Sequence, residues 1–346
     1  MTRKVGVIRD ERYLEHKPGL VHPEAPGRLR SVYRMLDKEF ENRLVQIEPK
    51  LATLEQLQMA HTPTYLDLIM STAERDFTPL SSDTFVSAKS YIAAWLAVGA
   101  GIRAVDALMG EEVRACFSLV RPPGHHALAD RAGGFCIFNN IGIAAKYAIE
   151  KYGLDRILII DWDIHHGNAL QDLFYRDSKV LYFSSHYMGW YPNTGDWDET
   201  GEADGAGYTV NVPVPKELED DDITYLYQNV LNRIVRRYKP QFIMVAAGFD
   251  AHERDPLGRT HLTEKAYRTL TQIVLQMSDA GNGVPIFFSL EGGYDNRALA
   301  ESIREVLDML AFDGRRDRLS LRSTKRAEEM LRKLRQTHGK HCVWIY

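Results

Sequence analysis

The chain has 346 residues, of which 45% are hydrophobic, and this content is enough for a large buried core. Its net charge of −4 and its pI of about 6.3 argue against a nucleic-acid scaffold, whose affinity would rest on a basic surface. No Pro/Ser-rich linker, low-complexity block or internal repeat divides the sequence, so we expect a single domain over residues 1–346.

The cysteines and the N-terminus indicate the compartment. Three cysteines (Cys116, Cys136 and Cys342) give no disulfide framework and suit a reducing environment. The N-terminal residues contain no apolar signal region, and we expect no stretch of membrane-spanning length. We therefore expect a soluble, cytoplasmic protein with no membrane and no nucleic-acid partner, and a homo-oligomer stays open.

Short apolar runs rich in β-branched residues predict strands that are buried on both faces. In chain order these runs are Val5–Ile8, Ala115–Val120, Ile157–Ile160, Val180–Ser184, Phe242–Ala247 and Pro285–Leu290. Helix-like segments such as Ser90–Met109 and Ile141–Lys151 lie between them, so the alternation predicts an α/β fold with a mostly parallel sheet covered by helices. A basic segment over about 323–338 predicts a C-terminal helix, which either closes the domain surface or makes an assembly contact.

Five of the predicted strands are followed by residues that carry chemistry. The segments that follow them are "RPPGHHA", "DWDIHHGN", "SHYMGWYPNTG", "GFDAHERDPLG" and "EGGYDN". Open α/β sheets bind ligands in the crevice beyond the carboxyl ends of their strands. These five segments can therefore converge on one pocket, although they are far apart in the sequence.

Asp163 and His165 predict half of a metal site. In an extended chain, residues i and i+2 share a face, so these two side chains can point at one centre while Trp162 and Ile164 turn away. Asp250 follows another strand and can reach the same crevice. Three protein ligands with an open position are typical of catalytic zinc sites.

The tandem histidines predict acid–base chemistry beside that metal. His125 and His126 can take a proton from an activated water and give one to a leaving nitrogen near neutral pH. Adjacent histidines need different partners to separate their pKa values, and Asp161 and Asn168 are the candidates. Asp161 can orient a histidine, or it can help to bind a monovalent cation together with backbone carbonyls.

A tyrosine after two glycines, and two acidic segments, can interact with the substrate. Gly292 and Gly293 let the backbone swing Tyr294 toward the site, where its hydroxyl can donate to a developing oxyanion. The acidic segments 196–204 and 217–222 are either solvated loops or a rim that attracts cationic substrates.

Taken together, these motifs resemble the histone deacetylase and acetylpolyamine amidohydrolase family. The resemblance runs from "HPEAPGRL" (His22–Leu29) to "LEGGY" (Leu290–Tyr294) and includes "GGFCIFNN". "PPGHH" and "LEGGY" resemble the class II branch, and the chain looks like a prokaryotic deacetylase. The resemblance implies a three-layer, arginase-like α/β fold with a central, mostly parallel sheet of about eight strands flanked by helices.

The resemblance also implies the catalytic roles. Zinc, or alternatively Fe²⁺, would be the cofactor, with His126 as general base and acid, His125 as its electrostatic partner, and Tyr294 polarising the substrate carbonyl. The full set of implied catalytic residues and metal ligands is His125, His126, Tyr294, Asp161, Asn168, Asp163, His165 and Asp250. A structural K⁺ would be bound by Asp161, Asp163, His165, Ser184 and Ser185.

The resemblance implies a substrate tunnel as well. Gly134, Phe135 and Tyr191 would line it, Asp83 would bind the substrate backbone at the rim, and Arg28 would lie beneath the site. The chain departs from the family pattern at Tyr191, where a phenylalanine is expected, so its tunnel mouth is more polar.

The expected function is hydrolytic removal of an acetyl or acyl group from an acylated amine, by metal-activated water. Polyamine-selective relatives can carry an acidic gatekeeper in the "DPxG" element, and here that position is Leu257, which favours acyl-lysine-like amides over acetylpolyamines. Two alternatives stay open: a dinuclear manganese ureohydrolase of the same fold, and a non-catalytic protein that binds acyl amines.

Overall fold

Eight parallel strands form the central sheet of the protein. The computed structural model describes residues 4–258, 260–312, 319, 321–341 and 343–344. The strand order is β2–β1–β5–β10–β9–β6–β7–β8, and every pairing in this sheet is parallel. The strands are β1 (Val5–Ile8), β2 (Val45–Gln46), β5 (Ala115–Ser118), β6 (Ile157–Asp161), β7 (Val180–Tyr187), β8 (Thr209–Val214), β9 (Phe242–Ala247) and β10 (Ile286–Leu290).

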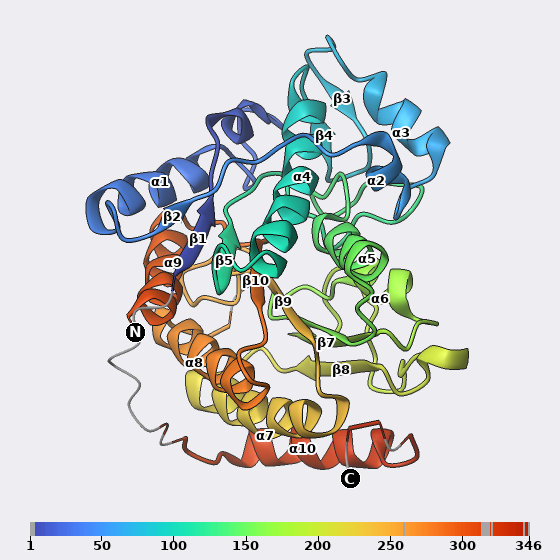
Figure 1. Cartoon of the computed structure of the whole chain (residues 1–346), viewed down its shortest axis with the longest axis vertical. Helices are drawn as coiled ribbons and strands as arrows, with labels where there is room; N and C mark the ends of the chain where they lie inside the picture. Colours follow the sequence, from blue (N-terminus) through green and yellow to red (C-terminus); the bar gives the residue numbers. More distant parts are fainter. Residues whose placement is uncertain (1–3, 259, 313–318, 320, 342, 345–346) are drawn as a thin grey trace.

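Helices cover both faces of this sheet (Figure 1). One group consists of α4 (Ser90–Met109), α5 (Asn140–Tyr152) and α6 (Asn168–Phe174), in which α5 contacts both of its neighbours. The other forms a row of α1 (Gly27–Glu39), α9 (Asn296–Ala311), α8 (Glu264–Ala280) and α7 (Asp220–Tyr238), with α10 (Lys325–His338) outside α7. The short helices α2 (Leu54–Gln58) and α3 (Pro63–Met70) lie near a small antiparallel pair, β3 (Thr78–Pro79) and β4 (Phe85–Val86). The predicted three-layer α/β fold is confirmed.

The α4 helix corrects one expectation from the sequence. Over Ser90–Met109 it is long and apolar enough to cross a membrane, whereas we expected no segment of that length. However, 72% of its most apolar window is buried inside the protein. Gly99 lets α4 pack directly against the backbone at Lys50, because a Cβ at this position would lie 1.6 Å from the Lys50 carbonyl oxygen. The apolar composition of α4 is therefore that of a core helix.

The strands at the two edges of the sheet differ most from the sequence prediction. β8 was missed because Asn211 and Pro213 interrupt its apolar pattern, although all six residues are buried. β2 was missed because it has only two residues and both are exposed. β7 continues through His186 and Tyr187, beyond the predicted end at Ser184. Burial and pairing stabilise β7 and β8 despite their polar residues, whereas pairing with β1 is what stabilises β2.

The C-terminal helix begins slightly later than predicted. The Thr324 hydroxyl accepts a hydrogen bond from the Ala327 backbone N–H (3.0 Å) and caps α10, which runs over Lys325–His338. Its buried side chains include Leu331 and Leu334, and the helix packs on α7. The helix therefore covers part of α7, and an assembly contact through its outer face stays a prediction.

The strand order explains why distant motifs meet. β5, β10, β9 and β6 are consecutive neighbours in the middle of the sheet, although long stretches of chain separate some of them. Since they are parallel, their carboxyl ends lie at the same edge. The segments after these four strands carry the tandem histidines, the Gly-Gly-Tyr turn, Asp250 and Asp163.

Candidate active site

Asp163, His165 and Asp250 come together in the structure. Their potential ligand atoms lie within 4.8 Å of one another, and all three residues are buried. His165 Nδ1 lies 3.1 Å from Asp163 Oδ1 and 2.8 Å from Asp250 Oδ2. One imidazole and two carboxylates that face a common centre can hold a divalent transition metal.

The geometric reason that we gave for this convergence was partly wrong. β6 ends at Asp161, so Asp163 and His165 lie in the turn after the strand and not on one face of it. The turn is held by its own carboxylates: Asp163 Oδ1 accepts a hydrogen bond from the His165 N–H (2.9 Å), and Asp250 Oδ1 accepts one from the Ile164 N–H (3.1 Å). Trp162 does turn away, and packs 6.3 Å from the ring of Phe249.

Two glycines leave the space that these carboxylates occupy. A Cβ at Gly292 would lie 2.3 Å from Asp250 Oδ2, and a Cβ at Gly248 would lie 2.1 Å from Asp163 Oδ2. The Gly292 N–H also donates to Asp163 Oδ2 (2.9 Å). The backbones after β9 and β10 therefore form a cradle around the two acids.

Burial and mutual charge set the ionisation of this cluster. Burial and the nearby Asp163 raise the pKa of Asp250 to about 7. Burial opposes protonation of His165, but the charges of Asp250 and Asp163 outweigh it and raise its pKa to about 10. The cluster therefore attracts positive charge, which a divalent cation can supply.

The two tandem histidines have the separate partners that were predicted. His125 Nδ1 donates to Asp161 Oδ2 (3.2 Å), and His126 Nδ1 donates to Asn168 Oδ1 (2.8 Å). Asp161 also accepts a hydrogen bond from the Tyr182 hydroxyl (2.9 Å). The two imidazole rings lie 3.9 Å apart, between centroids.

These partners give the two histidines opposite pKa shifts. Burial opposes the protonation of His125, but Asp163 and Asp161 outweigh it and raise its pKa to about 10. Burial, followed by the charges of His125 and His165, lowers the pKa of His126 well below its usual value. A neutral imidazole that can accept a proton thus lies beside a charged one that cannot.

Tyr294 is positioned by a residue that the sequence analysis did not select. Asp255 Oδ2 accepts a hydrogen bond from the Tyr294 backbone N–H (2.6 Å), and Asp255 Oδ1 accepts one from the Leu257 N–H (2.9 Å). The Tyr294 ring lies over the guanidinium of Arg28, whose Nε donates to the Gly293 carbonyl oxygen (2.6 Å). The signal that could have found Asp255 was its place in the "DPLG" element.

A cavity of about 170 Å³ opens onto the candidate metal ligand His165 and onto His126. It contains every predicted tunnel residue and adds Trp190, which the sequence analysis did not select. The lining residues are Asp83, His126, Gly134, Phe135, His165, Trp190, Tyr191, Leu257 and Tyr294. The cavity is narrow at Gly134, where a Cβ would lie 2.2 Å from the His126 ring. It therefore has room for a slender chain that ends near the metal ligands.

Asp83 lies at this cavity, but its carboxylate already has donors within the protein. Its oxygens accept hydrogen bonds from the Gly134 N–H (3.2 Å), the Ser81 hydroxyl (2.7 Å) and the Thr84 hydroxyl (2.8 Å). Burial, followed by the nearby charge of Asp83, raises the pKa of the Tyr191 hydroxyl. In this state Asp83 holds the turn at Gly134, and its predicted contact with substrate stays a prediction.

Three of the residues expected to bind potassium lie in the β6–β7 pair, and the other two, Asp163 and His165, lie in the turn that follows β6. Asp161 and Ser184 are paired in register. The Ser184 hydroxyl lies 2.9 Å from His186 Nδ1, and the Ser185 hydroxyl lies 2.7 Å from the Tyr227 hydroxyl. Potassium binding by Asp161, Asp163, His165, Ser184 and Ser185 stays a prediction.

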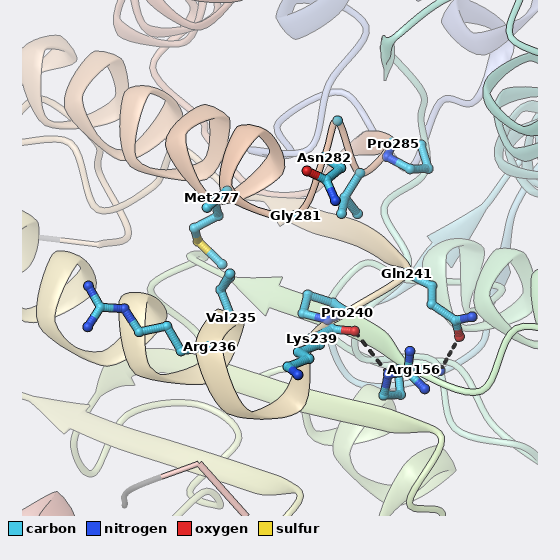
Figure 2. A pocket seen from close by; sticks show the side chains of 13 residues that line it. Arg156, Val235, Arg236, Lys239, Pro240, Gln241, Met277, Gly281, Asn282 and Pro285 are labelled. Carbon is cyan, nitrogen blue, oxygen red and sulfur yellow. Dashed lines mark hydrogen bonds between the residues drawn. The ribbon is translucent and has the colours of Figure 1, made fainter.

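A larger groove lies at the opposite edge of the sheet (Figure 2). Its volume is about 620 Å³, and its lining includes Arg156, Arg236, Lys239, Gln241 and Met277. The C-terminal ends of α7 and α8 border it, and the basic side chains in the last turn of α7 offset the negative end of that helix dipole. Although it is larger than the cavity at the metal ligands, it contains none of the predicted catalytic residues.

The fold and the site together define a metal-binding α/β enzyme with a buried acid–base histidine pair. The chain belongs to the histone deacetylase family, since the model of the histone deacetylase domain matches residues 22–310. It is therefore a deacetylase, a hydrolase whose candidate metal site is Asp163, His165 and Asp250.

Individual relatives agree with this assignment. A probable deacetylase of Archaeoglobus fulgidus is 36% identical over 292 residues, which cover 84% of this chain and 81% of the relative. Histone deacetylase 15 of Arabidopsis thaliana is 36% identical over 333 residues, and this match covers 93% of the chain but only 59% of the relative. The crystal structure of the HDA15 HD domain superposes with a TM-score of 0.91 at 33% identity, covering 99% of this chain and 96% of that one.

Proposed function

We propose that the protein is a zinc-dependent amidohydrolase that removes an acetyl group from an acylated primary amine. The observation that carries this proposal is the meeting of one imidazole and two carboxylates beside an acid–base histidine pair, next to a narrow cavity that His126 and His165 line. The donor set of Asp163, His165 and Asp250 fits zinc, and Fe²⁺ is the alternative. When bound, the metal supplies Lewis-acid activation of water and of the substrate carbonyl.

The side chains around the metal site supply proton transfer and stabilisation of the transition state. His126, whose pKa is lowered, accepts a proton from the attacking water and returns it to the leaving amine. His125, held by Asp161, stays protonated beside it and stabilises negative charge in the transition state. The Tyr294 hydroxyl donates to the carbonyl oxygen as charge develops there. Potassium would bind behind the site, at the β6–β7 pair, and would stabilise the turn that carries the metal ligands.

The mouth of the cavity supports acyl-lysine rather than acetylpolyamine as the amine class. A polyamine carries further ammonium groups, which need free carboxylates near the mouth. Asp83 supplies the single carboxylate among the lining residues, and its oxygens already accept protein donors. Leu257 is apolar, and the exposed side chains of Met188 and Trp190 add more apolar surface on the segment beside Tyr191.

The cysteines within the described residues agree with a reducing environment. Cys116 and Cys136 are both free and buried, and each has a raised pKa because burial disfavours the thiolate. Cys342 lies outside the described residues. The acidic net charge also gives no support to nucleic-acid binding. We infer that the protein acts in the cytoplasm on an acetylated amine.

The test is a turnover panel in which released acetate is measured. Acetyl-lysine peptides, acetylpolyamines and longer acyl-lysine peptides are compared with the zinc-loaded enzyme and with a chelated sample. We expect the highest kcat/KM on acetyl-lysine peptides and no turnover after chelation. Turnover of acetylpolyamines alone would contradict the assigned amine class, and full activity after chelation would contradict the zinc mechanism.

A further inference from the structure

Glu291 is a buried acid for which the proposed mechanism has no use. It is the first residue after β10, its exposed fraction is 0%, and it lies between the histidine loop and the Gly-Gly-Tyr turn. Within the described part of the chain, no lysine or arginine forms an ion pair with it, and the charge that favours its ionised form is that of His125. A buried carboxylate with so little compensation is costly, so its presence needs a reason.

One oxygen of this carboxylate binds the backbone of the histidine loop. Glu291 Oε2 accepts hydrogen bonds from two successive backbone N–H groups, those of Gly124 (2.6 Å) and His125 (3.1 Å). Two consecutive amides that point at one anion fix the local backbone orientation. From the other side, the His125 carbonyl oxygen accepts a hydrogen bond from the Ala169 N–H (3.2 Å) at the start of α6. The backbone of His125 is thus held between Glu291 and α6.

The same residue is tied to the rest of the site through its own backbone. Arg28 Nη2 donates to the Glu291 carbonyl oxygen (2.5 Å), and the Glu291 N–H donates to the Ala247 carbonyl oxygen (3.0 Å) at the end of β9. The next N–H, that of Gly292, donates to the metal ligand Asp163. Glu291 therefore connects the histidine loop to the two strands that carry the metal ligand Asp250 and the Tyr294 turn.

The second carboxylate oxygen points to a function in the active site. Oε1 is buried and has no hydrogen-bond partner among the described residues. Glu291, Cys136 and His125 offer atoms that lie within 4.8 Å of one another, so the carboxylate lies beside the His125 side chain. Packing alone would be served better by an apolar side chain of similar volume.

We propose that Glu291 is a positioning residue, whose carboxylate holds the Gly124–His125 backbone so that the histidine pair faces the scissile amide. This inference rests on the proposed function, because it concerns the placement of the acid–base pair. Side-chain partners alone leave the main chain of the loop free to shift, whereas two amide hydrogen bonds remove that freedom. A shift of about 1 Å in a catalytic group can cost roughly 10²-fold in rate.

A matched pair of variants isolates the hydrogen-bond acceptor. Glu291→Gln keeps an oxygen that can accept from both amides, whereas Glu291→Met has a similar length and no comparable acceptor. We expect Glu291→Gln to keep most of the wild-type kcat on an acetyl-lysine peptide. We expect Glu291→Met to lose roughly 10²-fold in kcat, with little change in KM and with one zinc per chain.

Other outcomes separate this inference from the proposed function. Equal kcat values for the Gln and Met variants would overturn the positioning role, whether both stay active or both fall. A loss in Glu291→Met that merely follows its loss of zinc or of folded protein, measured by metal analysis and circular dichroism, would also overturn it. An inactive wild-type enzyme would instead contradict the proposed function.

Discussion

Tyr294 is held in place before any substrate binds. Asp255 accepts a hydrogen bond from its backbone N–H, Arg28 lies under its ring at 4.9 Å, and Phe135 packs against its edge at 5.6 Å. Burial also raises the pKa of its hydroxyl well above the usual value, so the group stays protonated and can donate. A prepositioned donor contributes most where charge develops, in the transition state.

Replacement of this tyrosine tests its contribution to the rate. Tyr294→Phe removes the hydroxyl and keeps the ring, so the fold and the metal content should survive. We expect kcat to fall by roughly 10²–10³-fold with little change in KM, as measured by acetate release from the best substrate. A variant with nearly wild-type kcat would show that Tyr294 only packs against the cavity.

Leu257 is the residue with which to test the amine class. It lines the cavity and its backbone N–H is fixed by Asp255, so a longer acidic side chain there would reach the mouth. We expect Leu257→Glu to raise the kcat/KM ratio of acetylpolyamine to acetyl-lysine peptide by roughly tenfold, since a partly desolvated carboxylate attracts a cation by about 1–2 kcal/mol. Leu257→Gln is the control of equal length without charge. An unchanged ratio in the Glu variant would locate the selectivity elsewhere.

The sequence could identify the reactive side chains and the side-chain partners of the two histidines, but not the residues that hold the backbone around them. Asp163, His165, Asp250 and the histidine pair stand out because charged groups at the ends of buried apolar strands are costly unless they bind a ligand or a partner. Glu291 accepts hydrogen bonds from the Gly124 and His125 N–H groups, and Asp255 accepts one from the Tyr294 N–H, and these contacts between residues far apart in the chain cannot be predicted from local spacing. The resemblance implied that Asp83 lies at the rim, and it does line the cavity, but the hydrogen bond from the Gly134 N–H to its carboxylate could not be predicted from the sequence.

At the level of elements, the predictions succeeded where local pattern and tertiary burial agree. β1, β9 and α4 have the predicted bounds, because runs of apolar residues within them are buried on all sides. β8 and β2 have no such pattern, and parallel pairing with neighbours far along the chain determines them. The order of the strands could not be derived from periodicity either, although it decides which loops meet.

The α10 helix offers a separate test of stability at the level of one element. Leu334 is 1% exposed and faces α7 from a helix that contributes no residue to the cavity. We expect Leu334→Ala to reduce the free energy of unfolding by about 2–5 kcal/mol and to leave kcat/KM unchanged at room temperature. Urea denaturation and acetate release measure the two quantities. Arg332→Ala, on the exposed face of the same helix, should change stability by less than about 0.5 kcal/mol, and equal effects in both variants would contradict this packing.

At the scale of the whole molecule, buried neutral histidines make the fold sensitive to acid. His61 Nε2 accepts a hydrogen bond from the Asn139 N–H (2.9 Å), and Nδ1 lies 3.0 Å from the Leu128 carbonyl oxygen, so only the neutral ring satisfies both contacts. Burial lowers its pKa from 6.5 to about 4. A folded-state pKa below the unfolded value gives stability that is present above pH 6.5 and is lost as the pH falls toward 4.

The free energy of unfolding should therefore decrease over this pH range. The contribution of His61 is on the order of 3 kcal/mol, from its pKa shift alone. The test compares the wild-type protein with His61→Gln in chelated samples, so that loss of metal at low pH does not contribute. The Asp and Glu side chains titrate in both proteins, but the variant has no imidazole at position 61 to titrate. We expect the variant to show a shallower decrease between pH 6.5 and 4 in urea denaturation. Parallel curves for the two proteins would contradict the buried neutral state of His61.

The central claim is that one metal ion, bound by Asp163, His165 and Asp250, activates water for amide hydrolysis. A titration of the metal-free enzyme with zinc tests it most directly, with acetate release measured at each addition and bound metal measured by elemental analysis. We expect activity to rise linearly and to saturate at one zinc per chain, and we expect Asp250→Ala to bind little zinc and to stay inactive. Saturation at two metal ions per chain, or full activity of the metal-free enzyme, would contradict this claim.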